Sequence, residues 1–272
     1  MAPTIVPEAL PGRATVAAKA TSLVVSVAGL LVAWTGLALH LGDPRVLPTP
    51  VAVFELVVEY SLVGDAGRRT ALFHLRVTLV RVVVASLLAL GLGVALGALA
   101  ARDERFEDAI LPWIPFWMTV PTVVVVLVTM ILFDFGAVAV YASAVVVATP
   151  FCVTNVWEGV RDVDPELLEM ADAFGAGRRQ VWSGVYRYHL LPYVFSSYRH
   201  VLGIVWKIVV LGEVFGLGTG VGAMFNFYYM LGEVDSMLAY VSLFVGVLFV
   251  VEYVVLGAVE RWCFRWRADG RE

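Results

Sequence analysis

The chain contains few charged residues, two cysteines and four histidines. Only 15% of its 272 residues are charged, against roughly 25% in an ordinary soluble domain. Cys152 and Cys263 are far apart and lack the spacing of metal ligands, which argues against a structural disulfide or a metal centre. The sequence has neither a Walker A phosphate loop nor a recognisable hydrolytic triad. We therefore predict no catalytic residue, no metal site and no ATP hydrolysis by this chain itself.

An enzyme acting inside the membrane would need a nucleophile and a base clustered at one depth of its helices. The four histidines instead lie near the expected ends of hydrophobic segments: His40, His74, His189 and His200. The net charge of −4 is carried mostly by short loops and indicates no particular partner, and no nucleic-acid-binding pattern is present. The composition thus disfavours an intramembrane enzyme.

Hydrophobic sequence is abundant, at 60% of the residues. A bilayer core of ~30 Å requires about 20 apolar residues per helix, and unpaired backbone groups in lipid exclude everything but helices and closed barrels. We predict an all-α, polytopic membrane protein with a single transmembrane domain over residues 21–260, an N-terminal segment 1–20 and a C-terminal tail 261–272. The expected spans are residues 21–41, 79–100, 116–133, 137–157, 201–222 and 237–259.

Lysine and arginine are concentrated in the segments that are cytoplasmic if the N-terminus is inside, so both termini are predicted to be cytoplasmic. Arg45, Arg68 and Arg69 are exceptions, in the segment between the first two spans. There, prolines precede a short amphipathic stretch, residues 51–60, that fits the outer interface but cannot cross the membrane. The first hydrophobic run is too long for a signal peptide and is interpreted as a retained span.

Two spans have distinctive sequences. Small residues recur every four positions in the second span, which favours a close packing face within the bundle over a seam between two copies. They are Ala85, Ala89, Gly93, Gly97 and Ala101. Three prolines, at 112, 115 and 121, precede the valine-rich run of the third span, which is predicted to be a bent helix.

Between the fourth and fifth spans lies a polar segment of about forty residues, the loop 161–198. Asp164 and Pro165 form a typical helix start, with Asp as N-cap and Pro in the first turn. Gly175 is expected to end that helix, and a second helix is expected to begin at Gly177. The result would be a helical hairpin projecting from the membrane, either as a contact for a cytoplasmic partner or as a solvated loop without one.

This loop resembles a motif of known transporters. Glu169, Met170 and Ala171, followed three residues later by Gly175, resemble the E-A-A-x-x-x-G core found in permease subunits of ATP-binding-cassette (ABC) importers. The surrounding GVRDVDPELLEMADAFGA resembles the nitrate, sulfonate and taurine type. LPTP at 47–50, HLRVTLVRV from residue 74 and the fifth span with its acid and glycine cluster also resemble that family. Two departures are Met170, in place of a small residue, and VYRY at 185–188, in place of Ile-x-Leu-Pro.

The resemblance implies a non-catalytic subunit of the cell membrane that forms a translocation pathway. Its partners would be two cytoplasmic ATPase subunits, which use ATP and magnesium, an external solute-binding protein, a second and identical permease copy, and membrane lipid. The ATPase-coupling residues would be Glu169, Met170, Ala171, Asp172 and Gly175. A stand-alone secondary transporter or channel, with no such partners, is the alternative.

Ionisable residues within or near the spans are candidates for function, because burying a charge in lipid is costly. Candidate pathway residues are His200, Lys207 and Glu213. His200 and Lys207 lie seven residues apart and share one helix face, where Lys207 could bind an anionic solute. Lys207 could instead pair with Glu252 or Asp134. Arg81 is expected to neutralise Glu213 or Glu252.

Overall fold

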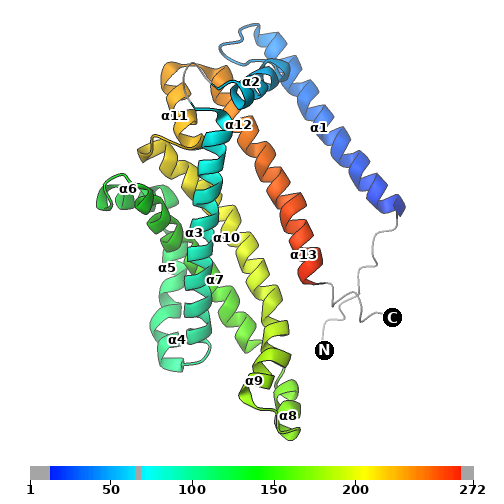
Figure 1. The fold of residues 1–272 in the computed structure, drawn as a ribbon, viewed down its shortest axis with the longest axis vertical. Coiled ribbons are helices and arrows are strands. Elements are labelled where there is room, and N and C mark those ends of the chain that lie inside the picture. Colours follow the sequence, from blue (N-terminus) through cyan, green and yellow to red (C-terminus); the bar gives the residue numbers. More distant parts are fainter. Residues whose placement is uncertain (1–12, 65–68, 265–272) are drawn as a thin grey trace.

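The computed structural model describes residues 13–64 and 69–264, which are built from helices joined by short connections (Figure 1). Five helices are long and apolar enough to cross a membrane, and a sixth crossing is possible for one bent pair. The predicted all-α, polytopic fold with about six spans is thus confirmed. The elements are α1 (Arg13–Leu41), α2 (Pro50–Leu62), α3 (Ala71–Ala100), α4 (Glu104–Ile110), η1 (Leu111–Trp113), α5 (Ile114–Thr119), α6 (Thr122–Leu132), α7 (Ala137–Arg161), α8 (Pro165–Ala173), α9 (Arg178–Val181), η2 (Trp182–Tyr186), α10 (Arg187–Gly216), α11 (Val221–Leu231), α12 (Val234–Phe249), η3 (Val250–Leu256) and α13 (Gly257–Cys263).

α3 and α10 begin before the ranges expected for their spans. α3 begins at Ala71 rather than at residue 79, because Thr70 caps its N-terminus by accepting a hydrogen bond from the Phe73 N–H group. The expected span 201–222 is replaced by α10, which begins at Arg187 and ends at Gly216. A non-helical turn follows, in which Gly220 has a φ of +115°. The first part of α10 is polar, so its start could not be recognised from hydrophobicity. The glycines from Gly216 to Gly220 end the helix before the predicted boundary.

The third hydrophobic run is broken more sharply than the predicted bend. The helical segment Glu104–Thr119 meets α6 at an angle of 101°. Val120 and Pro121 have extended backbone between the two parts, with ψ values of 126° and 122°. The 11 residues of α6 span only roughly 16 Å at the helical rise per residue. α6 is therefore too short to cross a bilayer alone.

The core of the bundle is formed by α3, α7 and α10. The small residues of α3 face α7, and a side chain added at Gly93 would collide with Cys152. A Cβ atom at Gly97 would lie 2.7 Å from the carbonyl oxygen of Val153. These contacts confirm that the small-residue face packs within the chain, because close approach of two helices requires small side chains.

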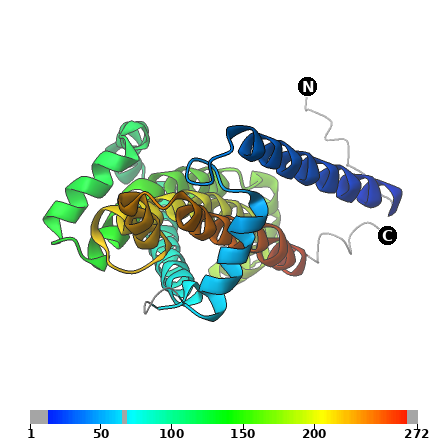
Figure 2. The ribbon, with the colours of Figure 1, turned by 90° about the horizontal axis from the view of Figure 1, so that it is seen from above.

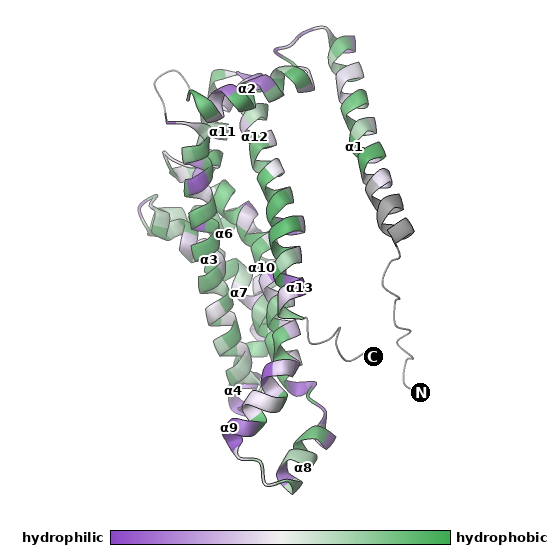
Figure 3. Ribbon diagram, turned by 45° about the vertical axis from the view of Figure 1, so that its right-hand side comes forward, coloured by the Kyte–Doolittle hydropathy of each residue, from purple (hydrophilic) through white to green (hydrophobic). Residues whose placement is uncertain are grey.

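The amphipathic stretch after the first span is helical, as α2, and Thr49 caps it. It lies at the end of the molecule opposite α8, near α11 (Figure 1). α1 stands apart from the bundle in two perpendicular views (Figures 1 and 2), and only 6% of its apolar window is buried. Among the few contacts of α1, the indole N–H of Trp34 donates to the carbonyl of Pro48. Figure 3 shows mainly hydrophobic residues along the long helices and polar residues around α9.

Candidate functional site

The hairpin between α7 and α10 has the capping structure that its sequence predicts. The Asp164 carboxylate accepts a hydrogen bond of 2.9 Å from the Glu166 N–H group, and Pro165 occupies the first turn of α8. Gly175 has a φ of +67°, a left-handed conformation that glycine adopts without a Cβ penalty. The N–H groups of Gly175 and Ala176 then return to the carbonyls of Asp172 and Ala171. Both ends of α8 are thus closed by local hydrogen bonds.

α8 presents an exposed apolar face. The side chains of Leu167, Met170 and Phe174 are 41%, 51% and 85% exposed, and their i, i+3, i+7 spacing places them on one side of the helix. Of the predicted coupling residues, Glu169, Met170, Asp172 and Gly175 are exposed, whereas Ala171 is buried. Leu167 and Phe174 were missed at the sequence level, although the same spacing could have identified them. An apolar face on a projecting helix is typical of a contact surface.

The second arm of the hairpin differs from the expected short helix and loop. α9 continues through the π-helical turn η2 into α10 without a break, so this arm is continuous with a helix that is long and apolar enough to cross a membrane. Near its base, the Tyr193 hydroxyl donates to Asp162 at 2.5 Å, and a Cβ at Gly159 would collide with the Tyr193 ring. Arg161 pairs with Glu107 at 2.6 Å. Movement of the hairpin would therefore be transmitted to α7 and α10.

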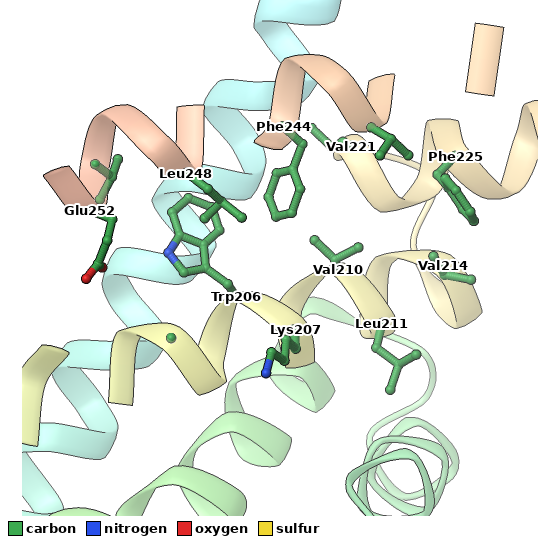
Figure 4. A pocket seen from close by; sticks show the side chains of 13 residues that line it. Trp206, Lys207, Val210, Leu211, Val214, Val221, Phe225, Phe244, Leu248 and Glu252 are labelled. Atoms are coloured by element: carbon green, nitrogen blue, oxygen red, sulfur yellow. The ribbon is translucent and has the colours of Figure 1, made fainter. Parts of the chain in front are cut away.

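A second candidate site lies along α10. His200, Gly203 and Lys207 are all exposed and recur at helical spacing, so they form an uncovered stripe on this helix. The lower part of Figure 4 shows Lys207 on α10, beside a cavity of about 610 Å³ that we call the Lys207 cavity. It is lined by Gly203, Trp206, Lys207, Val210, Leu211, Val214, Val221, Phe225, Val241, Phe244, Leu248, Val251 and Glu252. His200 does not line it and instead lies near the Phe151 ring, at a centroid distance of 5.1 Å.

Within the described residues, Lys207 forms no ion pair. Glu252 instead pairs with Arg199 at 2.7 Å, and Arg199 also reaches Glu260 at 3.3 Å. Asp134 lies in the turn after α6, with a φ of 54°. Lys207 also lines a second cavity, of about 420 Å³, beside the break between α5 and α6. The predicted pairing of Lys207 with Glu252 or Asp134 is therefore not formed.

Glu213 occupies a different, buried environment. Its side chain has no exposed surface, and its Oε1 atom lies 2.7 Å from Nη1 of Arg81. Thr78 donates to both carboxylate oxygens, and the Gly222 N–H group donates to Oε2 at 3.0 Å. Arg81 also donates to the carbonyl and hydroxyl oxygens of Thr219. Of the two carboxylates predicted as partners of Arg81, Glu213 is the one that pairs with it, and this pair fastens the turn between α10 and α11 to α3.

The Arg81–Glu213 cluster leaves no room for a side chain at Gly220, where a Cβ would collide with the Glu213 carboxylate. The Gly220 N–H group donates to Nδ1 of His74 at 3.2 Å. Glu213 does not line either cavity that contains Lys207. The three candidate pathway residues on α10 are therefore not brought together into one site.

Apolar spans, a projecting hairpin with an exposed apolar face and a cavity beside Lys207 are features of a polytopic membrane-transport protein; this lysine forms no ion pair among the described residues. The chain belongs to the family of binding-protein-dependent transport system inner membrane components, whose sequence profile matches residues 89–265.

Similar proteins are known among transport permeases. SsuC of Bacillus subtilis, assigned to aliphatic sulfonates transport, is 30% identical over 82% of this chain and 78% of its own length. TauC, the taurine transport system permease protein of Escherichia coli, is 25% identical over 88% of this chain and 87% of its own. ThiX of Halalkalibacterium halodurans, a formylaminopyrimidine transport permease protein, is 23% identical over 88% of this chain and 92% of its own length.

The fold is also similar to a chain of the inward-facing MetNI methionine ABC transporter, with a TM-score of 0.59 and 19% identity. The alignment covers 68% of this chain and 92% of that chain. The chain is thus an ABC importer permease, a class that generally lacks catalytic activity. Its family implies a multi-pass inner-membrane location, ATPase partners and a solute-binding protein.

Proposed function

We propose that this permease translocates a small anionic solute resembling a sulfonate, and that Lys207 is a binding group on its path. The observation that carries the proposal is a lysine on the rim of a largely apolar cavity, without a carboxylate partner among the described residues. A cationic side chain at that depth must find a counter-charge or water, because its desolvation is costly. An anionic solute would provide that counter-charge during its passage. The names of two similar permeases, for aliphatic sulfonates and taurine, support the same chemistry.

The coupling contact of the proposed transporter is α8. Its exposed face of Leu167, Met170 and Phe174, flanked by Glu169 and Asp172, suits insertion into a cleft of an ATPase subunit. ATP and magnesium would be bound by that subunit. α1 begins and α13 ends toward the α8 end of the molecule, away from α2 and α11 (Figure 1). With α8 facing the ATPase, both termini are cytoplasmic in this proposal, and α2 faces the outside.

A second, identical permease copy would complete the pathway. The stripe of His200, Gly203 and Lys207 is uncovered in the single chain, and α1 stands away from its own bundle. Both surfaces could be covered by another copy. The mass of the intact purified transporter tests this proposal. We expect two permease chains of this sequence in each complex, and a mass that accommodates only one would contradict it.

The substitution Lys207→Met tests the anion site. The loss of a charge-assisted contact, at about 1.5 to 3 kcal/mol, corresponds to uptake slower by about tenfold to a hundredfold. The measurement is ATP-driven uptake of a labelled sulfonate such as taurine into vesicles that contain the assembled transporter and its binding protein. Lys207→Arg, which keeps the positive charge, should retain most of the activity.

Lys207→Met should leave the amount of assembled complex unchanged, because Lys207 has no ion-pair partner among the described residues. Loss of assembly would indicate that Lys207 has a structural role. Normal assembly with normal uptake would refute the anion site.

A further inference from the structure

A cavity of about 670 Å³, which we call the Arg102 cavity, lies where the ends of α3 and α7 meet the α8–α9 hairpin. Its floor is apolar and includes Ala98, Val160 and Leu168. Trp182 and Tyr186 form an aromatic wall, stacked at a centroid distance of 5.8 Å and an interplanar angle of 24°. The cavity thus combines apolar and aromatic surface with the charged groups described next.

The charged residues of this cavity are mainly cationic. Arg102 and Arg178 line it together with a single carboxylate, Asp172. Neither arginine forms an ion pair with any residue in the described part of the chain. Two guanidinium groups in one cavity, with no carboxylate partner in the part of the chain that the structure describes, favour an anionic occupant, because arginine binds phosphate with paired hydrogen bonds.

The position of the cavity limits the kind of anion. Ala98 and Ala101 lie at the end of α3, which is long and apolar enough to cross a membrane, so we place the cavity at the boundary between lipid and water. Tryptophan and tyrosine are enriched at that boundary, and basic pockets between helices on the cytoplasmic side bind phospholipid headgroups. A soluble anion would contact the arginines but not the apolar floor. A phospholipid would contact both, with its headgroup at the arginines and its chains on the apolar residues.

We propose that the Arg102 cavity binds an anionic phospholipid, with its phosphate between Arg102 and Arg178 and its glycerol and upper chains against Trp182 and the apolar floor. The proposal rests on the orientation given above, in which α8 faces the cytoplasm. α8 would then contact different partners on opposite sides. Leu168 lies on the side of α8 that lines the cavity, while Met170 and Phe174 remain exposed for the ATPase. The bound lipid would thus contact α8 on the side opposite its proposed contact with the ATPase.

Tryptophan quenching by brominated lipids tests this site in the assembled transporter. The probes are vesicles of phosphatidylcholine with a minor fraction of phosphatidylglycerol, in which either one lipid or the other has brominated chains. We expect brominated phosphatidylglycerol to quench more than an equal amount of brominated phosphatidylcholine. Trp182→Phe should remove that excess, because Trp182 lies at the cavity wall. In Arg102→Gln/Arg178→Gln, the relative affinity for phosphatidylglycerol should fall about fivefold per arginine.

Arg105→Gln is the matched control, because Arg105 is exposed on α4 and does not line the cavity. It should keep the excess quenching. The proposal is overturned if the excess is absent from the unmodified protein, survives the double substitution, or is abolished by inorganic phosphate, which would identify a site for a soluble anion. ATP-driven uptake by the same vesicles tests the proposed transport function separately.

Discussion

Arg81→Met is expected to destabilise the permease by about 3 to 5 kcal/mol, the usual cost of removing one partner from a buried ion pair. The substitution leaves the fully buried Glu213 carboxylate without its guanidinium partner. The same change removes both hydrogen bonds from Arg81 to Thr219, so the turn before α11 loses its attachment to α3. Denaturant unfolding of the purified permease, followed by circular dichroism, measures the change.

Arg76→Met is the matched control for that experiment. Arg76 lies five residues earlier on the same helix, is exposed, and forms no ion pair with the described residues. Its substitution should change the free energy of unfolding by no more than about 0.5 kcal/mol. Arg81→Met/Glu213→Gln should recover part of the lost stability, because a neutral amide is less costly to bury than an unpaired carboxylate. Equal stability of the Arg81 and Arg76 variants would refute a stabilising role for the pair.

Phe174→Asp is expected to separate ATP hydrolysis from solute uptake while leaving the membrane domain folded. The Phe174 side chain is 85% exposed at the end of α8, so its loss removes no core contact. Aromatic anchors at protein interfaces commonly contribute 2 kcal/mol or more, so ATPase affinity should fall by roughly thirtyfold. Retention of the ATPase during purification, together with ATP-driven uptake, measures the effect.

Phe174→Leu controls for the introduced charge, because it keeps an apolar side chain at the same position. We expect this variant to retain most of the ATPase and most of the uptake. Glu169→Lys should act in the same direction as Phe174→Asp, since Glu169 is also exposed on α8. Normal ATPase retention and uptake in both Phe174→Asp and Glu169→Lys would show that α8 is not the coupling contact.

Local sequence signals predicted the elements whose ends are closed by neighbouring residues. Asp164 and Pro165 begin α8, and Gly175 ends it, because caps depend on hydrogen bonds within a few residues. The start of α10 at Arg187 was missed, since a helix that extends beyond the bilayer needs no apolar composition there. The sharp break at Val120 and Pro121 was anticipated only as a bend, because proline indicates that a helix is interrupted but does not specify the angle.

The sequence by itself determined that the protein lies in a lipid bilayer, that its fold is helical and which family it belongs to. Hydrophobic run length and the lack of charge are sufficient for the first two, because lipid leaves the backbone few alternatives. The tertiary structure alone decided which charges are neutralised. Glu213 is satisfied by groups from α3 and from the first turn of α11, whereas Lys207 has no ion-pair partner among the described residues because Glu252 contacts Arg199 instead. Such pairings depend on how distant helices pack together, and the spacing of residues along one helix does not contain that information.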